Sequence, residues 1–201
     1  MTTQTPADEA VTRNVLHTHA MRVDLDGSTV LRDVSVDIES GTCTALLGPN
    51  GSGKTTFLRA VLGLTPVTSG TVTWFGDSRT RLSQGLPIAL VPQLLPGATS
   101  VPVSVTEFVE SAFTSPRNRW RRWRMRTDRQ HAVARALEMV DLAGHAAQPI
   151  DALSGGQQRR ALFARAIATG ARVFLLDEPL AGVDVEHQAD LVSVLTRLRS
   201  D

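Results

Sequence analysis

Residues 48–55 constrain what this chain can fold into more than any other feature, because their sequence, GPNGSGKT, matches the pattern G-x-x-x-x-G-K-[ST]. Residues 42–47 come just before them and are predicted to be a buried strand. A helical stripe from Phe57 to Leu62 follows, and Gly63 is expected to end that helix. A glycine-rich loop between a strand and a helix is the setting in which this pattern binds phosphate.

The chemistry of that loop indicates a nucleoside triphosphate. Glycines let backbone N–H groups turn towards phosphate oxygens, and the helix N-terminus adds partial positive charge. Lys54 is the one lysine among 21 Lys and Arg residues, and its compact ammonium suits the β- and γ-phosphates better than a planar guanidinium. Thr55 offers a hydroxyl to Mg²⁺. We therefore expect the nucleotide to contact Gly48, Asn50, Gly51, Ser52, Gly53, Lys54, Thr55 and Thr56.

A pair of carboxylates follows an apolar run. Residues 173–176 read VFLL, which is typical of a strand buried on both faces, and Asp177 and Glu178 come directly after it. Because ligand-binding groups gather at the carboxyl ends of parallel strands, we expect Asp177 to hold the Mg²⁺ shell. Glu178 is expected to polarise an attacking water. This pair indicates hydrolysis.

A second glycine-containing segment, residues 153–157 with the sequence LSGGQ, precedes a helix that is expected to begin near Gln158. A serine and two glycines at a helix start form another anion nest. One chain rarely needs two such nests. The second nest is therefore predicted to face the nucleotide of another subunit.

The remaining pattern predicts an α/β chain. Alternating Val34, Val36 and Ile38 indicate a half-buried strand, and Asp26-Gly27-Ser28 indicates a hairpin turn. Further strands are expected over residues 70–75 and 88–91, and helices over residues 104–113, around Val133, Leu137 and Val140, and over residues 185–198.

Composition excludes several classes of protein. The 201 residues, 42% of them hydrophobic, suit one soluble globular domain. The net charge of +1 gives no indication of a nucleic-acid binder, and the Arg/Trp run of residues 117–126 is interpreted as a solvated loop. The one cysteine, Cys43, excludes an internal disulfide framework and is expected in the core. No signal peptide or membrane span is expected, and residues 1–13 are predicted to be a disordered tail.

The LSGGQ segment lies between Lys54 and Asp177 in the chain. The three motifs in that chain order give a resemblance to the nucleotide-binding subunit of ABC transporters, in which LSGGQ is the signature motif. The resemblance runs from about residue 14 to the end. It implies an α/β P-loop NTPase fold of ABC type: a mixed sheet with an antiparallel β subdomain and an inserted helical subdomain, at about residues 94–157. Residues 14–201 would form this ATPase domain, C-terminally truncated.

The resemblance also implies roles for individual residues. Gln93 resembles the glutamine that senses Mg²⁺ and the γ-phosphate, and residues 181–184 resemble the loop that links two subunits. The family works as a head-to-tail homodimer, so each ATP-binding site would be completed by residues of the other subunit. The residues implied are Lys54, Gln93 and Glu178 for catalysis, Thr55, Gln93 and Asp177 for Mg²⁺, and Ser154, Gly155, Gly156 and Gln157 in trans.

Residues 88–93 and 101–109 are similar to the pattern found in the ATPases of zinc and manganese importers. This finer resemblance implies metal-ion import, with haem, siderophore or drug transport as alternatives. It also implies a transmembrane permease partner, an indirect extracytoplasmic solute-binding protein, and a peripheral place at the cytoplasmic face of the membrane.

Two departures from the family pattern leave alternatives open. Leu25 stands near the position of the usual adenine-stacking aromatic residue. The family's switch histidine is also expected about thirty residues beyond Glu178, past Asp201. The resemblance therefore leaves two expectations open: a truncated form, or a nucleotide-binding module with impaired hydrolysis. A soluble ABC protein of translation or DNA repair is a third interpretation, disfavoured because the chain has neither two cassettes nor a coiled-coil insertion. The pair His17 and His19 is interpreted as a strand-edge feature rather than a metal site.

Overall fold

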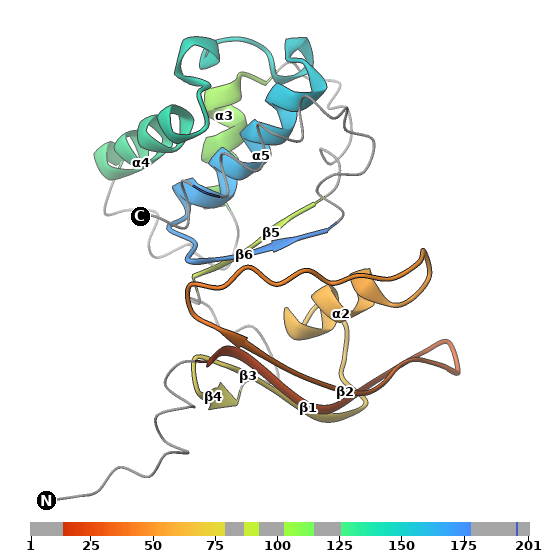
Figure 1. Ribbon diagram of the computed structural model, residues 1–201. Helices are drawn as coiled ribbons and strands as arrows, with labels where there is room; N and C mark the ends of the chain where they lie inside the picture. The colour runs from red at the N-terminus through yellow and green to blue at the C-terminus, as the bar shows by residue number, and fades with distance from the viewer. Residues whose placement is uncertain (1–13, 79–86, 93–102, 115–125, 178–195, 197–201) are drawn as a thin grey trace, which may run out of the picture. The chain divides into compact units, whose positions relative to one another are not determined.

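The computed structural model describes residues 14–78, 87–92, 103–114, 126–177 and 196. The chain forms two compact units, Met1–Ser83 and Gln84–Asp201, and each is described by itself (Figure 1). The predicted tail of residues 1–13 and the predicted final helix of residues 185–198 lie outside the described residues, apart from Thr196, which is helical.

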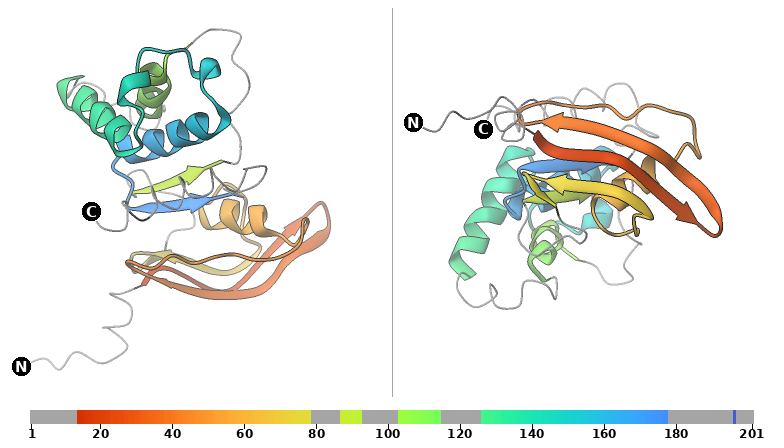
Figure 2. Two further views of the ribbon diagram at one scale, coloured as in Figure 1. Left: turned by 45° about the horizontal axis from the view of Figure 1, so that its top comes forward. Right: turned by 90° about the horizontal axis from the view of Figure 1, so that it is seen from below.

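The first unit contains one antiparallel sheet with the strand order β2-β1-β3-β4 (Figure 2). The strands are β1 (Asn14–Leu25), β2 (Ser28–Glu39), β3 (Ser69–Trp74) and β4 (Asp77–Ser78). Asp26 and Gly27 connect β1 to β2 with φ of 49° and 78°. Positive φ at both central residues is the requirement of the two-residue turn that matches strand twist, so the predicted hairpin is confirmed.

One face of this sheet carries the core of the first unit. Leu16, Met21 and Val23 on β1 are buried, as is Trp74 on β3. The apolar stripe of α2 (Lys54–Val61) is buried too, and Trp74 Nε1 donates a 2.7 Å hydrogen bond to the carbonyl oxygen of Val61. This bond satisfies the indole N–H, which would otherwise be costly to bury. The structure thus confirms the predicted helix, which ends before Gly63 at φ 65°.

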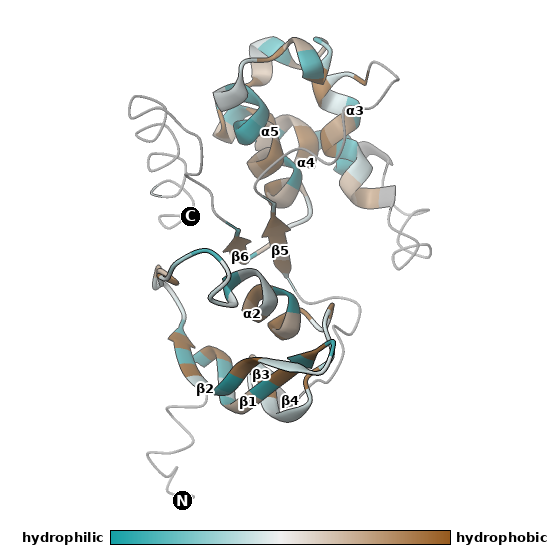
Figure 3. Ribbon diagram, turned by 90° about the vertical axis from the view of Figure 1, so that its right-hand side faces the viewer, coloured by the Kyte–Doolittle hydropathy of each residue, from teal (hydrophilic) through white to brown (hydrophobic). Residues whose placement is uncertain are grey.

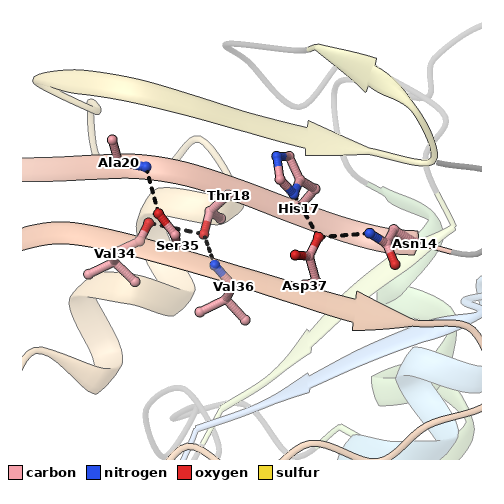
Figure 4. Close-up of polar contacts among 8 residues, drawn as sticks. All are labelled: Asn14, His17, Thr18, Ala20, Val34, Ser35, Val36 and Asp37. Carbon is pink, nitrogen blue, oxygen red and sulfur yellow. Dashed lines mark hydrogen bonds and ion pairs between the residues drawn. The ribbon is translucent and has the colours of Figure 1, made fainter. Parts of the chain in front are cut away.

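A β-bulge interrupts β1 at Ala20, whose φ is 47°. The surrounding backbone groups are satisfied by side chains. Thr18 Oγ1 donates to the Val34 carbonyl at 3.2 Å and accepts from Val36 N–H at 3.0 Å, and Ser35 Oγ accepts from Ala20 N–H at 2.9 Å (Figure 4). These bonds explain why Thr18, a polar residue, is fully buried.

The prediction of a buried strand over residues 42–47 is wrong. The segment has no strand structure, Cys43 is exposed rather than part of the core, and Leu46 and Leu47 are 47% and 88% exposed. A strand buried on both faces needs hydrogen-bonded neighbours. Among the described residues of the first unit, the four strands form one sheet in which residues 42–47 have no place.

The second unit has a parallel pair of strands, β5 (Ile88–Val91) and β6 (Val173–Leu176), in register from Ile88 opposite Val173 to Val91 opposite Leu176. Both strands are hydrophobic along their length (Figure 3). Three helices gather beside them: α3 (Val105–Glu110), α4 (Arg126–Met139) and α5 (Gly155–Ala168). Short 3₁₀ helices connect these: η1 (Ser111–Thr114), η4 (Ala143–His145) and η5 (Ile150–Ala152).

The helices of the second unit share one apolar core. The predicted stripe of Val133, Leu137 and Val140 is buried in it, together with Leu142 and Phe163. The helix predicted over residues 104–113 is α-helical only to Glu110 and continues as η1. Among the described helices, none has both the length and the apolar character needed to span a membrane.

Candidate nucleotide-binding site

Residues 48–53 form a tight loop whose glycines are required by its shape. Gly51 and Gly53 have φ of 81° and 92°, in the left-handed region that glycine adopts without strain. A Cβ at Gly53 would lie 2.8 Å from Leu31 Cδ2, and one at Gly48 would lie 2.7 Å from Ser52 Oγ. The loop therefore packs on β2 and on itself too closely for side chains at these two positions.

The Lys54 ammonium lies back over this loop. Lys54 Nζ donates to the carbonyl oxygen of Gly48 at 2.9 Å and to that of Pro49 at 3.0 Å. The two bonds hold a positive charge at the start of α2, whose first turn contains no acidic residue. A helix N-terminus that carries a cation and has no acidic residue in its own first turn is suited to bind an anion.

The other residues predicted to contact the nucleotide differ in their exposure to solvent. Asn50, Gly51 and Ser52 are exposed, whereas Thr55 and Thr56 are half-buried in the first turn of α2. Leu25, near the position expected to meet adenine, is 38% exposed at the end of β1. The roles of these side chains stay predictions.

In the second unit, Asp177 follows β6 directly. Its backbone N–H donates to the Val91 carbonyl at 3.2 Å, which continues the β5–β6 pairing to this residue. Asp177 is half-buried and directly follows the carboxyl end of a parallel strand pair, as predicted. Gln93, Glu178 and residues 181–184 lie outside the described residues.

The signature segment begins helix α5 earlier than expected, at Gly155 rather than near Gln158. The reason is a capping box: Ser154 Oγ accepts from the Gln157 N–H at 3.3 Å, and Gln157 Oε1 accepts from the Ser154 N–H at 2.9 Å. Gly155 and Gly156 occupy the first turn between these two residues. The amide groups of this nest are thus oriented by local bonds within the second unit.

A second capping box begins helix α3. Glu107 Oε2 accepts from the Ser104 N–H at 2.8 Å and from the Ser104 hydroxyl at 2.7 Å. These hydrogen bonds, from the hydroxyl first and the backbone second, lower the pKa of the Glu107 carboxyl below its ordinary value.

Sequence reasoning assigned no role to one residue at this site. His145, at the end of η4, lies with its Nε2 3.0 Å from Gln157 Nε2. The two residues are twelve positions apart and belong to different elements, so no local pattern could have paired them.

His17 and His19 lie on β1, a central strand, so their interpretation as a strand-edge pair is wrong. Their ring centroids lie 6.5 Å apart and the rings are stacked. His17 Nδ1 lies 2.6 Å from Asp37 Oδ1, a contact drawn in Figure 4. Asn14 Nδ2 donates to the same oxygen at 2.7 Å. Within the described ranges, no group of three or more His, Cys, Asp or Glu residues is placed to hold a metal ion.

Comparison with known proteins identifies the family. The ABC transporter family model matches residues 31–181. The zinc import ATP-binding protein ZnuC of Pseudomonas syringae pv. syringae is 40% identical over 177 residues, 88% of this chain and 60% of the relative. The cobalamin import ATP-binding protein BtuD of Halobacterium salinarum is 39% identical over 180 residues, 88% of this chain and 44% of the relative.

Solved structures agree on the fold. The crystal structure of an ATP-binding cassette of an ABC transporter in its ADP conformation matches with a TM-score of 0.83 at 22% identity, covering 94% of this chain and 78% of that chain. The chain belongs to the ABC transporter family and has the α/β P-loop fold of its ATPases. It spans about 60% of the length of the zinc-import relative.

Proposed function

We propose that this chain is the ATP-binding and ATP-hydrolysing subunit of an ABC importer. The observation that carries the proposal is the Lys54 ammonium held over the carbonyls of Gly48 and Pro49, beside a helix start without acidic residues. This is the geometry of a positive cradle for the β- and γ-phosphates of ATP. The match to the ABC transporter family supports ATP as the nucleotide.

Mg²⁺ would be held by oxygen ligands from this chain. The Thr55 hydroxyl, the Asp177 carboxylate and the Gln93 side-chain oxygen are the hard donors that this ion prefers, and the two described residues of this set are half-buried. When bound, the ion neutralises charge on the phosphate oxygens. Glu178 would accept a proton from the attacking water, and Gln93 would orient that water.

A second copy of the chain would complete each site. In this proposal the Ser154 hydroxyl and the N–H groups of Gly155 and Gly156 bind the γ-phosphate of the ATP held by the partner's loop, and Gln157 holds this nest in place through the capping box. The support is the capping box, which leaves the start of α5 ordered without any acidic side chain in its first turn. An anion is therefore favoured at this helix start.

The transported substrate is proposed to be a metal ion, because the ATP-binding subunit of a zinc importer is among the most similar relatives. The cobalamin-import relative makes a metal chelate the alternative. ATP hydrolysis at the cytoplasmic face of the membrane would drive transport through a separate transmembrane permease. An extracytoplasmic binding protein would deliver the substrate to that permease.

The test is steady-state Mg²⁺-ATP turnover by the purified chain beside its Glu178→Gln variant. We expect turnover in the parent chain and its loss in the variant, with ATP binding kept in both. Binding without turnover in the parent would favour the alternative, a nucleotide-binding module with impaired hydrolysis. Absence of ATP binding would overturn the proposal.

A further inference from the structure

The contact between His145 and Gln157 determines the protonation of the histidine ring. The backbone N–H of Ser154 can only donate, so the Gln157 amide atom 2.9 Å from it must be the oxygen. The other amide atom is then the NH₂ group, which also can only donate. Because this group lies 3.0 Å from His145 Nε2, that ring nitrogen must accept.

We propose that neutral His145, protonated on Nδ1, is a positioning residue for the signature segment. Its Nε2 lone pair fixes the orientation of the Gln157 amide, and that orientation keeps Oε1 on the Ser154 N–H. If the amide turned over, its NH₂ group would face the Ser154 N–H and the capping box would open. His145 thus acts through Gln157 on the anion nest, and its effect on ATP rests on the proposed function.

The backbone around His145 is well anchored, so its ring can serve as a fixed reference. Its N–H donates to the carbonyl of Leu142, a residue fully buried in the core, at 2.9 Å. The following loop is tied to the start of α3, because the Ala146 carbonyl accepts from both the N–H and the hydroxyl of Thr106, at 3.0 and 2.9 Å. His145 and Gln157 are themselves half-buried, where a hydrogen bond competes less with water.

The position of the proton on the His145 imidazole ring can be tested by NMR spectroscopy. Long-range ¹H–¹⁵N correlation spectra of the full ¹⁵N-labelled chain in alkaline buffer report which imidazole nitrogen carries the hydrogen. The His145 signals are assigned by their absence in a His145→Gln variant. We expect protonated Nδ1 and bare Nε2. A ring protonated on Nε2 would overturn the proposal.

A variant series tests the consequence. His145→Leu removes the acceptor at similar volume, whereas His145→Gln offers a side-chain oxygen in its place. His131→Leu makes the same change at an exposed position on α4 and is the control. Loss of a cap of typical strength predicts about fivefold faster hydrogen exchange of the Ser154 N–H in His145→Leu. Exchange near the parent rate is expected in the other two variants, and unchanged exchange in His145→Leu would contradict the proposal.

The functional readout separates this inference from the proposed function. In His145→Leu, the ATP-dependent association constant of two chains should fall about fivefold for each signature segment in the dimer. The affinity of the Lys54 loop for nucleotide should stay unchanged. Association equal to that of the parent would refute the effect on ATP. If the parent chain did not bind ATP, the proposed function would fail, and the tautomer and the exchange rate would still decide the positioning role.

Discussion

The Lys54 ammonium lies 2.9 Å from the carbonyl oxygen of Gly48, so the side chain and the first residue of its own loop are joined across five intervening positions. The bond turns the positive charge of the side chain back onto the loop that precedes it. A lysine can make this return because its charge is compact and its stem is flexible, whereas an arginine fork is larger and planar.

Lys54→Ala should weaken ATP binding about 10- to 100-fold, because a hydrogen bond to a charged group contributes about 1.5–3 kcal/mol. Titration with a fluorescent ATP analogue measures this change. Arg59→Ala, which removes an exposed cation from the last turn of the same helix, is the control and should bind as the parent does. Equal losses in the two variants would mean that general charge, not the loop, binds the nucleotide.

Gly53→Ala and Gly51→Ala should differ in stability although both glycines have positive φ. Each change adds backbone strain of roughly 1–2 kcal/mol. Only at Gly53 does the new Cβ also meet Leu31, at 2.8 Å, while the space at Gly51 is open. The free energy of unfolding measured with urea should therefore be lower for Gly53→Ala than for Gly51→Ala. The reverse order would contradict the contact between the loop and Leu31.

Ser154→Ala and Ser104→Ala remove the same group from two capping boxes. Each should lower the free energy of unfolding by about 1 kcal/mol, because one helix-start donor loses its acceptor. Only Ser154→Ala should also reduce ATP turnover, since Ser154 is proposed to bind the partner's nucleotide. Similar turnover in the two variants would argue against the signature role of Ser154.

The Glu107 capping box should make stability depend on pH. Hydrogen bonds from Ser104 lower the pKa of Glu107 in the folded chain, so below its ordinary value the unfolded chain binds more protons than the folded one. The stabilisation is therefore complete above the unfolded pKa and is lost as pH falls through the lower, folded pKa. Urea unfolding at a series of pH values between about 3 and 6 gives the free energy of unfolding at each pH. This free energy should change less with pH in Glu107→Gln than in the parent chain. An unchanged pH dependence would exclude this contribution.

The sequence predicted local features better than contacts between distant segments. The turn at Gly27, helix α2 after Gly53 and the strands β5 and β6 follow from turn chemistry, helical spacing and short apolar runs, and the structure confirms them. The phosphate-binding role of the Lys54 loop stays a prediction. The strand over residues 42–47 was wrongly predicted because a strand also needs hydrogen-bonded neighbours, which the local sequence does not specify. The contact of His145 with Gln157 could not be predicted, since it depends on where η4 places a ring beside α5.

The early start of α5 shows a similar limit. Two glycines are poor helix formers, so propensity alone favours a helix that begins after them. The Ser-x-x-Gln spacing is a capping signal that outweighs this preference, because it satisfies two donors at the helix start. That signal was present in the sequence and was assigned only to anion binding.

The most direct test of the account is the assembly state of Glu178→Gln with saturating Mg²⁺-ATP, measured by sedimentation velocity. If ATP is held between the Lys54 loop of one chain and the Ser154 nest of another, this variant should form a stable dimer that requires ATP. Adding Lys54→Ala to the same chain should return it to monomers. A variant that binds ATP and stays monomeric would contradict the shared site.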